Sequence, residues 1–345
     1  MKKILVTIIT LIAIIQISFG QENLEIVAEL DKRPGNVAVG NKGRVFVTLH
    51  PLGSSKMQLI EITGKSSYKP YPNKKIQNVT NAPNDSKFDT PLGIVVDKDN
   101  WIWVIDMGLN LGKTRLFAFD IATGKQVFRY NLSKKIAPKG SFIQDLAVDK
   151  ENGWVYLADI ANPGIIAINI KNNTARRLTH KSVEAENVDM IIKGKKIHFG
   201  GKPARVAINP ITLSADNETL FYGAMNGTTW YKLPTKLFRE GRNDYSISKQ
   251  IKVVGPKPVS DGATIDLNGN HYFTNPQNFG IDILTNNGEL KPLLRNKKID
   301  FPDNVRFGPN GWLYIAVNQL YKTPAFTGNK DLGKAPYYIF RTKVY

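Results

Sequence analysis

The 345-residue sequence contains no cysteine and only four histidines. Without cysteine there is no disulfide bond, no thiolate metal ligand and no thiol nucleophile. The histidines stand in no short metal-binding spacing such as HExxH, and we expect each to satisfy a local hydrogen bond; they are His50, His180, His198 and His271. A G-x-S-x-G nucleophile turn and a Walker loop are also missing. The sequence therefore gives no support for hydride transfer or nucleotide hydrolysis.

Basic residues are abundant, but they are not gathered in one tract. Lysine and arginine number 47 against 29 acidic residues, which gives a formal net charge of +18. The basic pairs and runs are spread along the chain, at 134–135, 176–177, 193–196 and 297–298. A nucleic-acid interface is expected to show a basic stripe with interleaved aromatic residues. The scattered pattern instead predicts no nucleic-acid partner and a solvated basic surface, suited to anionic surfaces or acidic small ligands.

The first twenty residues have the pattern of a targeting segment. Lys2 and Lys3 precede an apolar run at 4–15 and a small-x-small sequence at 18–20. This order is typical of a secretory signal peptide, and the apolar run is short for a bilayer span. We expect residues 1–20 to be cleaved, leaving residues 21–345 as a single domain without a transmembrane anchor. Secretion or a periplasmic location follows, and the absence of disulfides favours the periplasm.

One sequence pattern recurs six times along the chain. Its clearest copy is SDGATIDLNGNHYFTN at 260–275, which has a polar start, a short apolar strand, an Asn-Gly turn and an aromatic strand. This order is typical of a β-hairpin. The six copies start 42 to 65 residues apart, at Asn36, Thr90, Gln144, Asn209, Asp261 and Asp303. A repeated supersecondary unit at such a spacing indicates a propeller or a solenoid.

Further strand-like runs lie between the hairpins, at 116–120, 164–170 and 281–285. They bring the count to about four strands per repeat, the number in a propeller blade. Periodic helices, which an α-solenoid would need, are nearly absent. The sequence therefore predicts an all-β fold, a six-bladed β-propeller of four-stranded antiparallel blades. We also expect the strands at 24–30 and 337–345 to share one blade, because joining them closes the ring and removes two sheet edges.

The second strand of each hairpin is rich in aromatic residues, which we expect to fill the core between blades. The innermost strands start at the channel mouth, so their polar first residues should surround one end of the channel. The candidate polar contacts are Asn36, Gln144, Asp145, Asn209, Asp261, Asp303 and Asn304, with Phe142 and Tyr222 as candidate stacking surfaces. Such oxygens suit Ca²⁺ or another divalent cation, with an aspartate as base. Asp and Asn also cap turns without any ligand, and this alternative stays open.

At residues 209–238 the chain reads NPITLSADNETLFYGAMNGTTWYKLPTKLF, and it later carries Ser260-Asp261-Gly262-Ala263 and Phe301-Pro302-Asp303-Asn304-Val305. This ordered series resembles the major royal jelly/yellow protein family over about residues 25–345. The resemblance implies a secreted six-bladed propeller that binds small ligands, such as biogenic amines, in its channel. A dopachrome-converting activity is attributed to some yellow-type members.

The repeat is more remotely similar to the regucalcin/gluconolactonase superfamily. That similarity implies a channel metal held by a first-blade glutamate together with Asn209 and Asp261, and a substrate-binding pair at Gln144-Asp145. The first-blade glutamate is missing here, because Arg33-Pro34-Gly35-Asn36 stands in its place. A guanidinium there disfavours a second positive charge, although Asn36 still offers one oxygen.

Three functional hypotheses follow. The leading one is an exported propeller that binds a small polar or aromatic molecule in its channel, with tautomerase-type chemistry at Asp261. Its rival is a lactonase-like hydrolase with a divalent metal on Asn209 and Asp261. The third is a non-catalytic interaction scaffold. The sequence leaves the identity of the ligand and the oligomeric state open.

Overall fold

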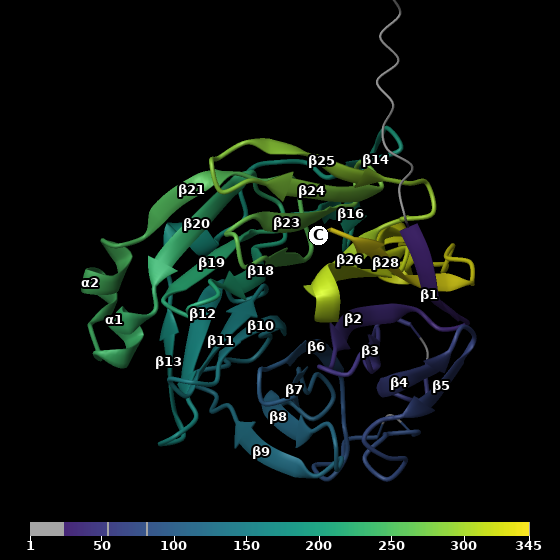
Figure 1. The fold of residues 1–345 in the computed structure, drawn as a ribbon, viewed down its shortest axis with the longest axis horizontal. Helices are drawn as coiled ribbons and strands as arrows, with labels where there is room; N and C mark the ends of the chain where they lie inside the picture. Colours follow the sequence, from purple (N-terminus) through teal and green to yellow (C-terminus); the bar gives the residue numbers. More distant parts are fainter. Residues whose placement is uncertain (1–23, 54, 81, 345) are drawn as a thin grey trace, which may run out of the picture.

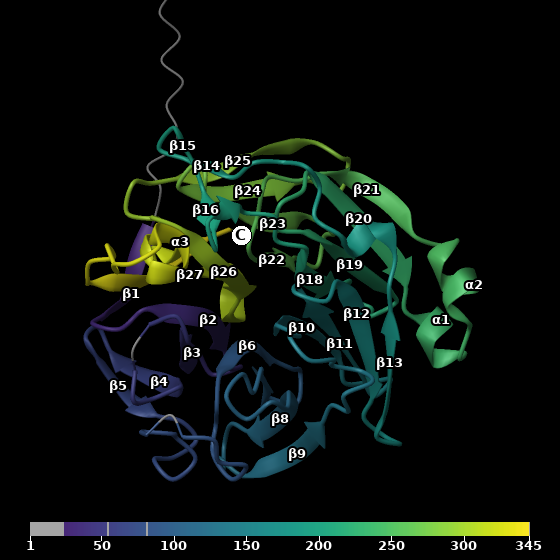
Figure 2. The same cartoon turned by 180° about the vertical axis from the view of Figure 1, so that it is seen from behind.

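The computed structural model describes residues 24–53, 55–80 and 82–344. The expected signal peptide at residues 1–20 lies outside these described residues. Six antiparallel sheets of four strands each stand around a central axis (Figure 1, Figure 2). The predicted six-bladed β-propeller is therefore confirmed.

Within the first five blades the strands run in sequence order from the axis to the periphery. Blade 1 comprises β2 (Pro34–Val39), β3 (Val45–Leu49), β4 (Leu59–Gly64) and β5 (Ser67–Pro70). Blade 2 comprises β6 (Pro91–Val96), β7 (Trp101–Asp106), β8 (Arg115–Asp120) and β9 (Gln126–Asn131). Blade 3 comprises β10 (Ile143–Asp149), β11 (Trp154–Asp159), β12 (Gly164–Asn169) and β13 (Thr174–Leu178).

Blade 4 comprises β18 (Ile208–Leu213), β19 (Thr219–Ala224), β20 (Thr229–Pro234) and β21 (Lys252–Pro256). Two short helices, α1 (Lys236–Arg239) and α2 (Asp244–Ser248), project from its rim. Blade 5 comprises β22 (Ala263–Ile265), β23 (His271–Asn275), β24 (Gly280–Leu284) and β25 (Leu290–Arg295). Blade 6 starts with β26 (Pro302–Phe307) and β27 (Trp312–Val317), which the turn η2 (Pro309–Gly311) connects.

Both ends of the described chain complete blade 6. Strand β28 (Tyr337–Lys343) pairs with β27, and β1 (Leu24–Leu30) adds to the outer edge of β28. The register runs from Leu24 opposite Thr342 to Leu30 opposite Tyr337. The first and last strands therefore hold the ring closed through backbone hydrogen bonds, as the sequence predicts.

The aromatic second strands supply much of the packing between blades. Trp103 on β7 and Tyr156 on β11 are fully buried, as are Tyr272 and Phe273 on β23. Tyr156 lies in an apolar cluster with side chains of β18 and β19, which joins blade 3 to blade 4. Each fully buried large apolar side chain stabilises the fold by about 1.5–3 kcal/mol. The predicted role of these aromatics in the core is confirmed.

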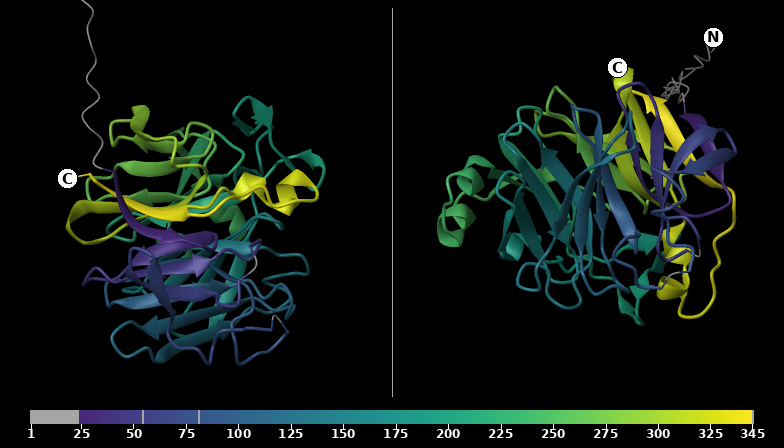
Figure 3. Two further views of the ribbon diagram at one scale, coloured as in Figure 1. Left: turned by 90° about the vertical axis from the view of Figure 1, so that its right-hand side faces the viewer. Right: turned by 90° about the horizontal axis from the view of Figure 1, so that it is seen from below.

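One end of the wheel carries an addition to the regular blades. Between blades 3 and 4 the chain forms the turn η1 (Lys181–Val183) and two small hairpins, β14 (Ile191–Ile192) with β15 (Lys195–Lys196) and β16 (His198–Phe199) with β17 (Lys202–Pro203). Between β27 and β28 it forms η3 (Leu320–Lys322) and α3 (Pro324–Thr327). In side view the hairpins and α3 lie at the same end, away from the C-terminus (Figure 3). We call β16, β17 and α3 the lid. No helix in the described part of the chain is both long and apolar enough to span a membrane.

Candidate functional site

A β-bulge near the start of the innermost hairpin is shared by five of the six blades. The strand register shifts between Pro34 and Val37, Pro91 and Ile94, Ile143 and Asp145, Ile208 and Ile211, and Pro302 and Asn304. An extra residue at a bulge lies outside the regular pairing and its side chain is re-aimed. Four of the candidate site residues occupy these irregular positions: Asn36, Gln144, Asn209 and Asp303.

In blade 5, Asp261 is positioned by backbone hydrogen bonds to a threonine side chain. Asp261 and Gly262 precede β22, and their backbone N–H groups donate to Thr274 Oγ1 at 3.1 and 3.0 Å. Gly262 is needed for close packing, because a Cβ atom there would lie 2.7 Å from the carbonyl oxygen of Asp303. The inner strands of blades 5 and 6 can therefore approach each other only with glycine at this position. The result is that Asp261 and Asp303 lie at the same end of the channel.

The two carboxyl groups are buried and have amide partners. Asn209 Nδ2 donates a hydrogen bond to Asp261 Oδ1. Asp303 accepts from Asn318 Nδ2 at 2.6 Å and from Asn36 Nδ2 at 3.3 Å. Burial raises the pKa of Asp303 to about 7. Burial also raises the pKa of Asp261 well above its usual value, and the nearby charge of Asp303 raises it further. Asp261 therefore holds its proton more tightly than an ordinary aspartate.

His50 adjoins this carboxyl pair, with its Nε2 atom 4.0 Å from Asp303 Oδ2. Its Nδ1 accepts a hydrogen bond from the backbone N–H of Leu52 at 3.1 Å, so in the neutral ring the proton is on Nε2. Burial lowers the pKa of His50 to about 3, and the positive charge of Arg33 acts in the same direction. His50 is therefore a neutral hydrogen-bond donor facing Asp303.

An ion pair spans the channel between opposite blades. Arg306 Nη2, on β26 of blade 6, donates to Asp145 Oδ1, on β10 of blade 3, at 2.6 Å. Arg306 Nη1 also donates to the carbonyl oxygen of Ala263 in blade 5 at 2.8 Å. Both charged side chains are buried. The pair therefore ties three blades together at the axis, and Asp145 is engaged in the structure of the channel.

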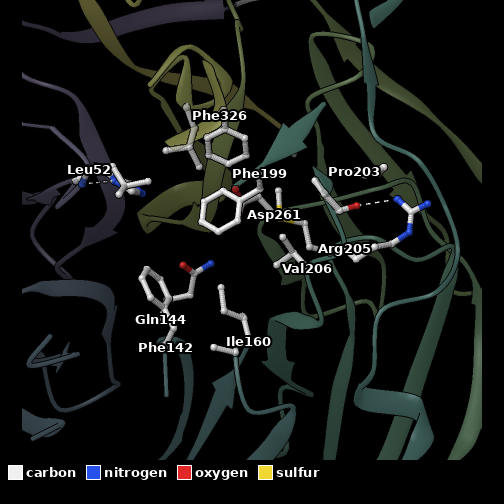
Figure 4. Close-up of a pocket in the computed structure, with 15 residues that line it drawn as sticks. Leu52, Phe142, Gln144, Ile160, Phe199, Pro203, Arg205, Val206, Asp261 and Phe326 are labelled. Atoms are coloured by element: carbon white, nitrogen blue, oxygen red, sulfur yellow. Dashed lines mark hydrogen bonds between the residues drawn. The ribbon is translucent and has the colours of Figure 1, made fainter. Parts of the chain in front are cut away.

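A cavity of about 400 Å³ opens at this end of the channel. Its wall is mostly apolar, and Phe199 and Phe326 of the lid meet edge to face above it, with ring centres 5.1 Å apart (Figure 4). Asp261 and Gln144 also line the cavity, and the amide of Gln144 lies below Phe199 in this view. We call this cavity the channel pocket; it is lined by His50, Leu52, Phe142, Gln144, Ile160, Ala161, Phe199, Pro203, Ala204, Arg205, Val206, Met225, Asp261, Leu320 and Phe326.

Apart from Tyr222, the candidate residues from the sequence fall into three groups. Phe142, Gln144 and Asp261 line the channel pocket. The buried amides and carboxylates beside it do not line it themselves; these are Asn36, Asp145, Asn209 and Asp303. Asn304 accepts a hydrogen bond from the backbone N–H of Val37 at 3.2 Å and so joins blades 6 and 1.

Tyr222 lies away from the channel pocket. It is fully buried in the apolar cluster between blades 3 and 4, and its hydroxyl lies 2.8 Å from Ser182 Oγ. The reason is its place on β19, the second strand of its blade, whose aromatic side chains face the neighbouring blade. The aromatic rings that line the channel pocket are those of Phe142, Phe199 and Phe326.

Sequence reasoning missed His50 and the lid aromatics Phe199 and Phe326. The expectation that each histidine satisfies a local hydrogen bond is confirmed by contacts to Leu52 N, Ser182 N, Lys196 O and Trp230 Nε1. For His50 that contact does not prevent the ring from lining the pocket. The signal for the lid was the spacing of 65 residues between the third and fourth repeats, the longest of the series.

A divalent metal does not fit these residues. Within the described part of the chain, no group of three or more His, Asp or Glu side chains could hold a metal ion. Asn209 turns its amide nitrogen toward Asp261, so the two expected ligands bind each other. The buried guanidinium of Arg33 donates to the carbonyl oxygens of Asn318 and Gln319 and pairs with Asp331 at 2.8 Å. Its positive charge still acts on the site, where it lowers the pKa of His50, and so disfavours a further cation.

The sequence profile of the major royal jelly protein family matches residues 90–320, which is more than half of the chain. The chain belongs to the major royal jelly protein family. It is 21% identical to major royal jelly protein 3 of Apis mellifera over 268 residues, which cover 72% of this chain and 44% of that protein. It is 25% identical to dopaminechrome tautomerase of Drosophila melanogaster over 124 residues, which cover 32% of this chain and 27% of that protein. The matched segments thus span less than half the length of these curated relatives.

Several solved structures share this fold. A gluconolactonase from Xanthomonas campestris superposes with a TM-score of 0.60 at 11% identity, covering 94% of this chain and 90% of the other. Virginiamycin B lyase from Staphylococcus aureus gives 0.57 at 16% identity, covering 94% and 100%. Regucalcin from Agrobacterium tumefaciens gives 0.56 at 13% identity, covering 93% of each chain. At such low identity these likenesses concern the fold alone.

Proposed function

We propose that the channel pocket binds a small planar aromatic molecule and that Asp261 donates a proton to it in a tautomerisation. The observation that carries this proposal is the position of Asp261, a buried carboxyl group on the wall of a mostly apolar pocket, whose pKa burial raises well above its usual value. A volume of about 400 Å³ suits one small organic molecule. The rings of Phe142, Phe199 and Phe326 offer faces and edges against which an aromatic ring can pack.

In the proposed step a C–H bond of the bound molecule breaks and its electron pair becomes part of a new C=C bond. Asp261 donates its proton to the carbonyl oxygen of the same molecule, and water at the pocket mouth takes the proton released from carbon. The carboxylate of Asp261 then regains a proton from water. Asn209 stabilises that carboxylate through its amide N–H, and Gln144 offers an amide for orienting the substrate. The tautomerase among the relatives supports this choice of reaction class.

The test uses dopaminechrome as the probe, with its tautomerisation followed by visible absorbance and the binding of dopamine followed by calorimetry. We expect Asp261→Asn to lower the rate by about 10²–10⁴-fold, the usual contribution of a positioned acid, while dopamine still binds. Asp266→Asn is the matched control, because Asp266 is a buried aspartate of the same blade whose oxygens bind Asn268, Asn270 and Tyr272 outside the pocket. Parent protein that neither binds dopamine nor accelerates the reaction would refute the proposal.

A further inference from the structure

A second hollow lies on the outer side of the lid. It has a volume of about 430 Å³ and is bounded by the β14–β15 hairpin, β16, η3 and α3. Phe326 lines both this hollow and the channel pocket, so one ring contributes to the wall of each. No residue predicted from the sequence as part of the site lines the hollow. We call it the outer pocket.

The outer pocket has an excess of positive charge. Lys193, Lys195, Lys196 and Lys322 line it, whereas no aspartate or glutamate is among its lining residues. Two acids form ion pairs with lysines of this set without lining the pocket themselves. Asp300 accepts from Lys322 Nζ at 2.7 Å, with Lys193 Nζ at 3.9 Å.

The second of these acids is already shared between two cations. Asp189 lies 2.6 Å from Lys196 Nζ and also 2.6 Å from Arg205 Nη2. Lys195 forms no ion pair within the described residues. The four lysines and Arg205 therefore share only two carboxylates, those of Asp300 and Asp189. Among the lysines, Lys193 and Lys195 are the ones whose charge is least neutralised. An anion placed between these two lysines would meet an attractive field.

The remaining wall is apolar and partly open to solvent. Tyr321 and Phe326 line it, and so does Leu332, of which 58% is exposed. The chain positions these groups through backbone hydrogen bonds: Leu332 N donates to Lys322 O at 2.8 Å, and Gly200 N donates to Ala325 O at 3.3 Å. A hollow with apolar sides and cationic edges fits a ligand that is itself divided into a ring and an anionic group.

We propose that the outer pocket binds a small amphipathic organic anion, an aromatic ring carrying a carboxylate or sulfonate group. The ring packs against Tyr321, Phe326 and Leu332, and the anionic group lies between Lys193 and Lys195. A volume of about 430 Å³ admits a molecule of one or two rings. The proposal is independent of the chemistry in the channel pocket.

Calorimetry with naphthalene-1-sulfonate tests the proposal at low ionic strength. We expect Lys193→Glu/Lys195→Glu to weaken its binding by about tenfold or more, because two attractive charges become repulsive. Lys252→Glu is the matched control: Lys252 is an exposed lysine on β21 that lines no part of the outer pocket, and its replacement should leave the affinity unchanged. In the parent protein, uncharged 1-naphthol should bind more weakly than the sulfonate.

Two results would overturn the proposal. One is a double variant that is folded, by its thermal unfolding, and binds the probe as the parent does. The other is loss of binding in Phe142→Ala, which alters only the channel pocket, without loss in the lysine variant; the probe would then occupy the channel. If the double variant fails to fold, Lys195→Glu alone decides, because Lys195 is exposed and unpaired within the described residues.

Discussion

Buried aspartates occur in two different settings in this propeller. In blade 2, Asp106 accepts from Arg115 Nη2 at 2.6 Å and from the backbone N–H groups of Asp89 and Thr90 at 2.8 Å. In blade 3, Asp159 is held in the same way by Arg177 Nη2 at 2.6 Å and by backbone N–H groups. In both blades the carboxylate lies at the end of a second strand and its arginine follows on the third or fourth strand. In each blade the aspartate thus connects its own strand to an arginine and to the loop that precedes the blade.

Asp261 and Asp303 are equally buried but have amide partners in place of a guanidinium. A buried carboxylate without a cation is costly, and the group holds its proton more tightly instead. Burial raises the pKa of Asp106 as well, but there the charge of Arg115 acts against it. The comparison therefore concerns the partner: an arginine supplies a charge that favours the carboxylate, whereas the amide of Asn209 gives Asp261 a hydrogen bond without that charge.

The largest loss of stability is expected when the cation of an arginine-paired aspartate is removed. We expect Arg115→Met to lower the free energy of unfolding by about 3–5 kcal/mol, because Asp106 would remain as a buried carboxylate without its cation. Urea unfolding followed by circular dichroism measures the change. Lys113→Met is the control, since Lys113 pairs with the exposed Asp85 at 2.8 Å and its loss should cost less than about 1 kcal/mol. Equal losses in the two variants would contradict the distinction.

The aspartates of the channel should make the free energy of unfolding depend on pH, and Asp303 shows how. The folded-state pKa of Asp303, about 7, is above the value of 3.8 for an ordinary aspartate. The folded state thus binds this proton more tightly than the unfolded chain. The resulting stability is fully present below pH 3.8 and is lost as pH rises through 7.

We therefore expect the parent to lose about 2 kcal/mol relative to Asp303→Asn between pH 5 and pH 7.5. His50, Asp145 and Arg33, which face Asp303, are present in both proteins. Asp261 is also present in both, but the variant removes the charge of Asp303 that raises its pKa, so the difference reports the two carboxyl groups together. Denaturant unfolding at several pH values gives the measurement. Asp99→Asn, at an exposed aspartate, should follow the parent, and a variant at Asp303 that did so would contradict the raised pKa.

Most of the fold could be predicted from the sequence, because the hairpin pattern that produces each blade is repeated along the chain. Each blade needs an apolar strand, a tight turn and an aromatic strand, and six copies of that pattern leave few alternatives. Closure by the first and last strands followed from the same logic, since the strand-like runs at 24–30 and 337–345 lie outside the six repeated hairpins, and β1 does pair with β28. The first residues of the inner strands could also be predicted to gather at one end of the channel.

The details of the site depend on irregular features that carry no repeating pattern. The bulges at Asn36, Asn209 and Asp303 change where side chains point, and a periodic pattern does not show them. The lid brings Phe199 and Phe326 together across 127 positions of sequence, through segments that belong to no blade. Such contacts are set by tertiary packing, so the aromatic surface of the pocket could not be read from the repeats.

The smallest expected effect is that of Tyr222→Phe, which distinguishes a side chain of the core between blades from one that lines the channel pocket. Tyr222→Phe removes only the hydroxyl that lies 2.8 Å from Ser182 Oγ, so we expect a loss of about 1 kcal/mol in the free energy of unfolding. Ser182→Ala should cost a similar amount, and the double variant should cost less than the sum, because both changes remove the same bond. Dopamine affinity, measured by calorimetry, should be unchanged in all three variants. A weaker affinity in Tyr222→Phe would contradict this separation, because it would mean that the Tyr222 hydroxyl contributes to ligand binding.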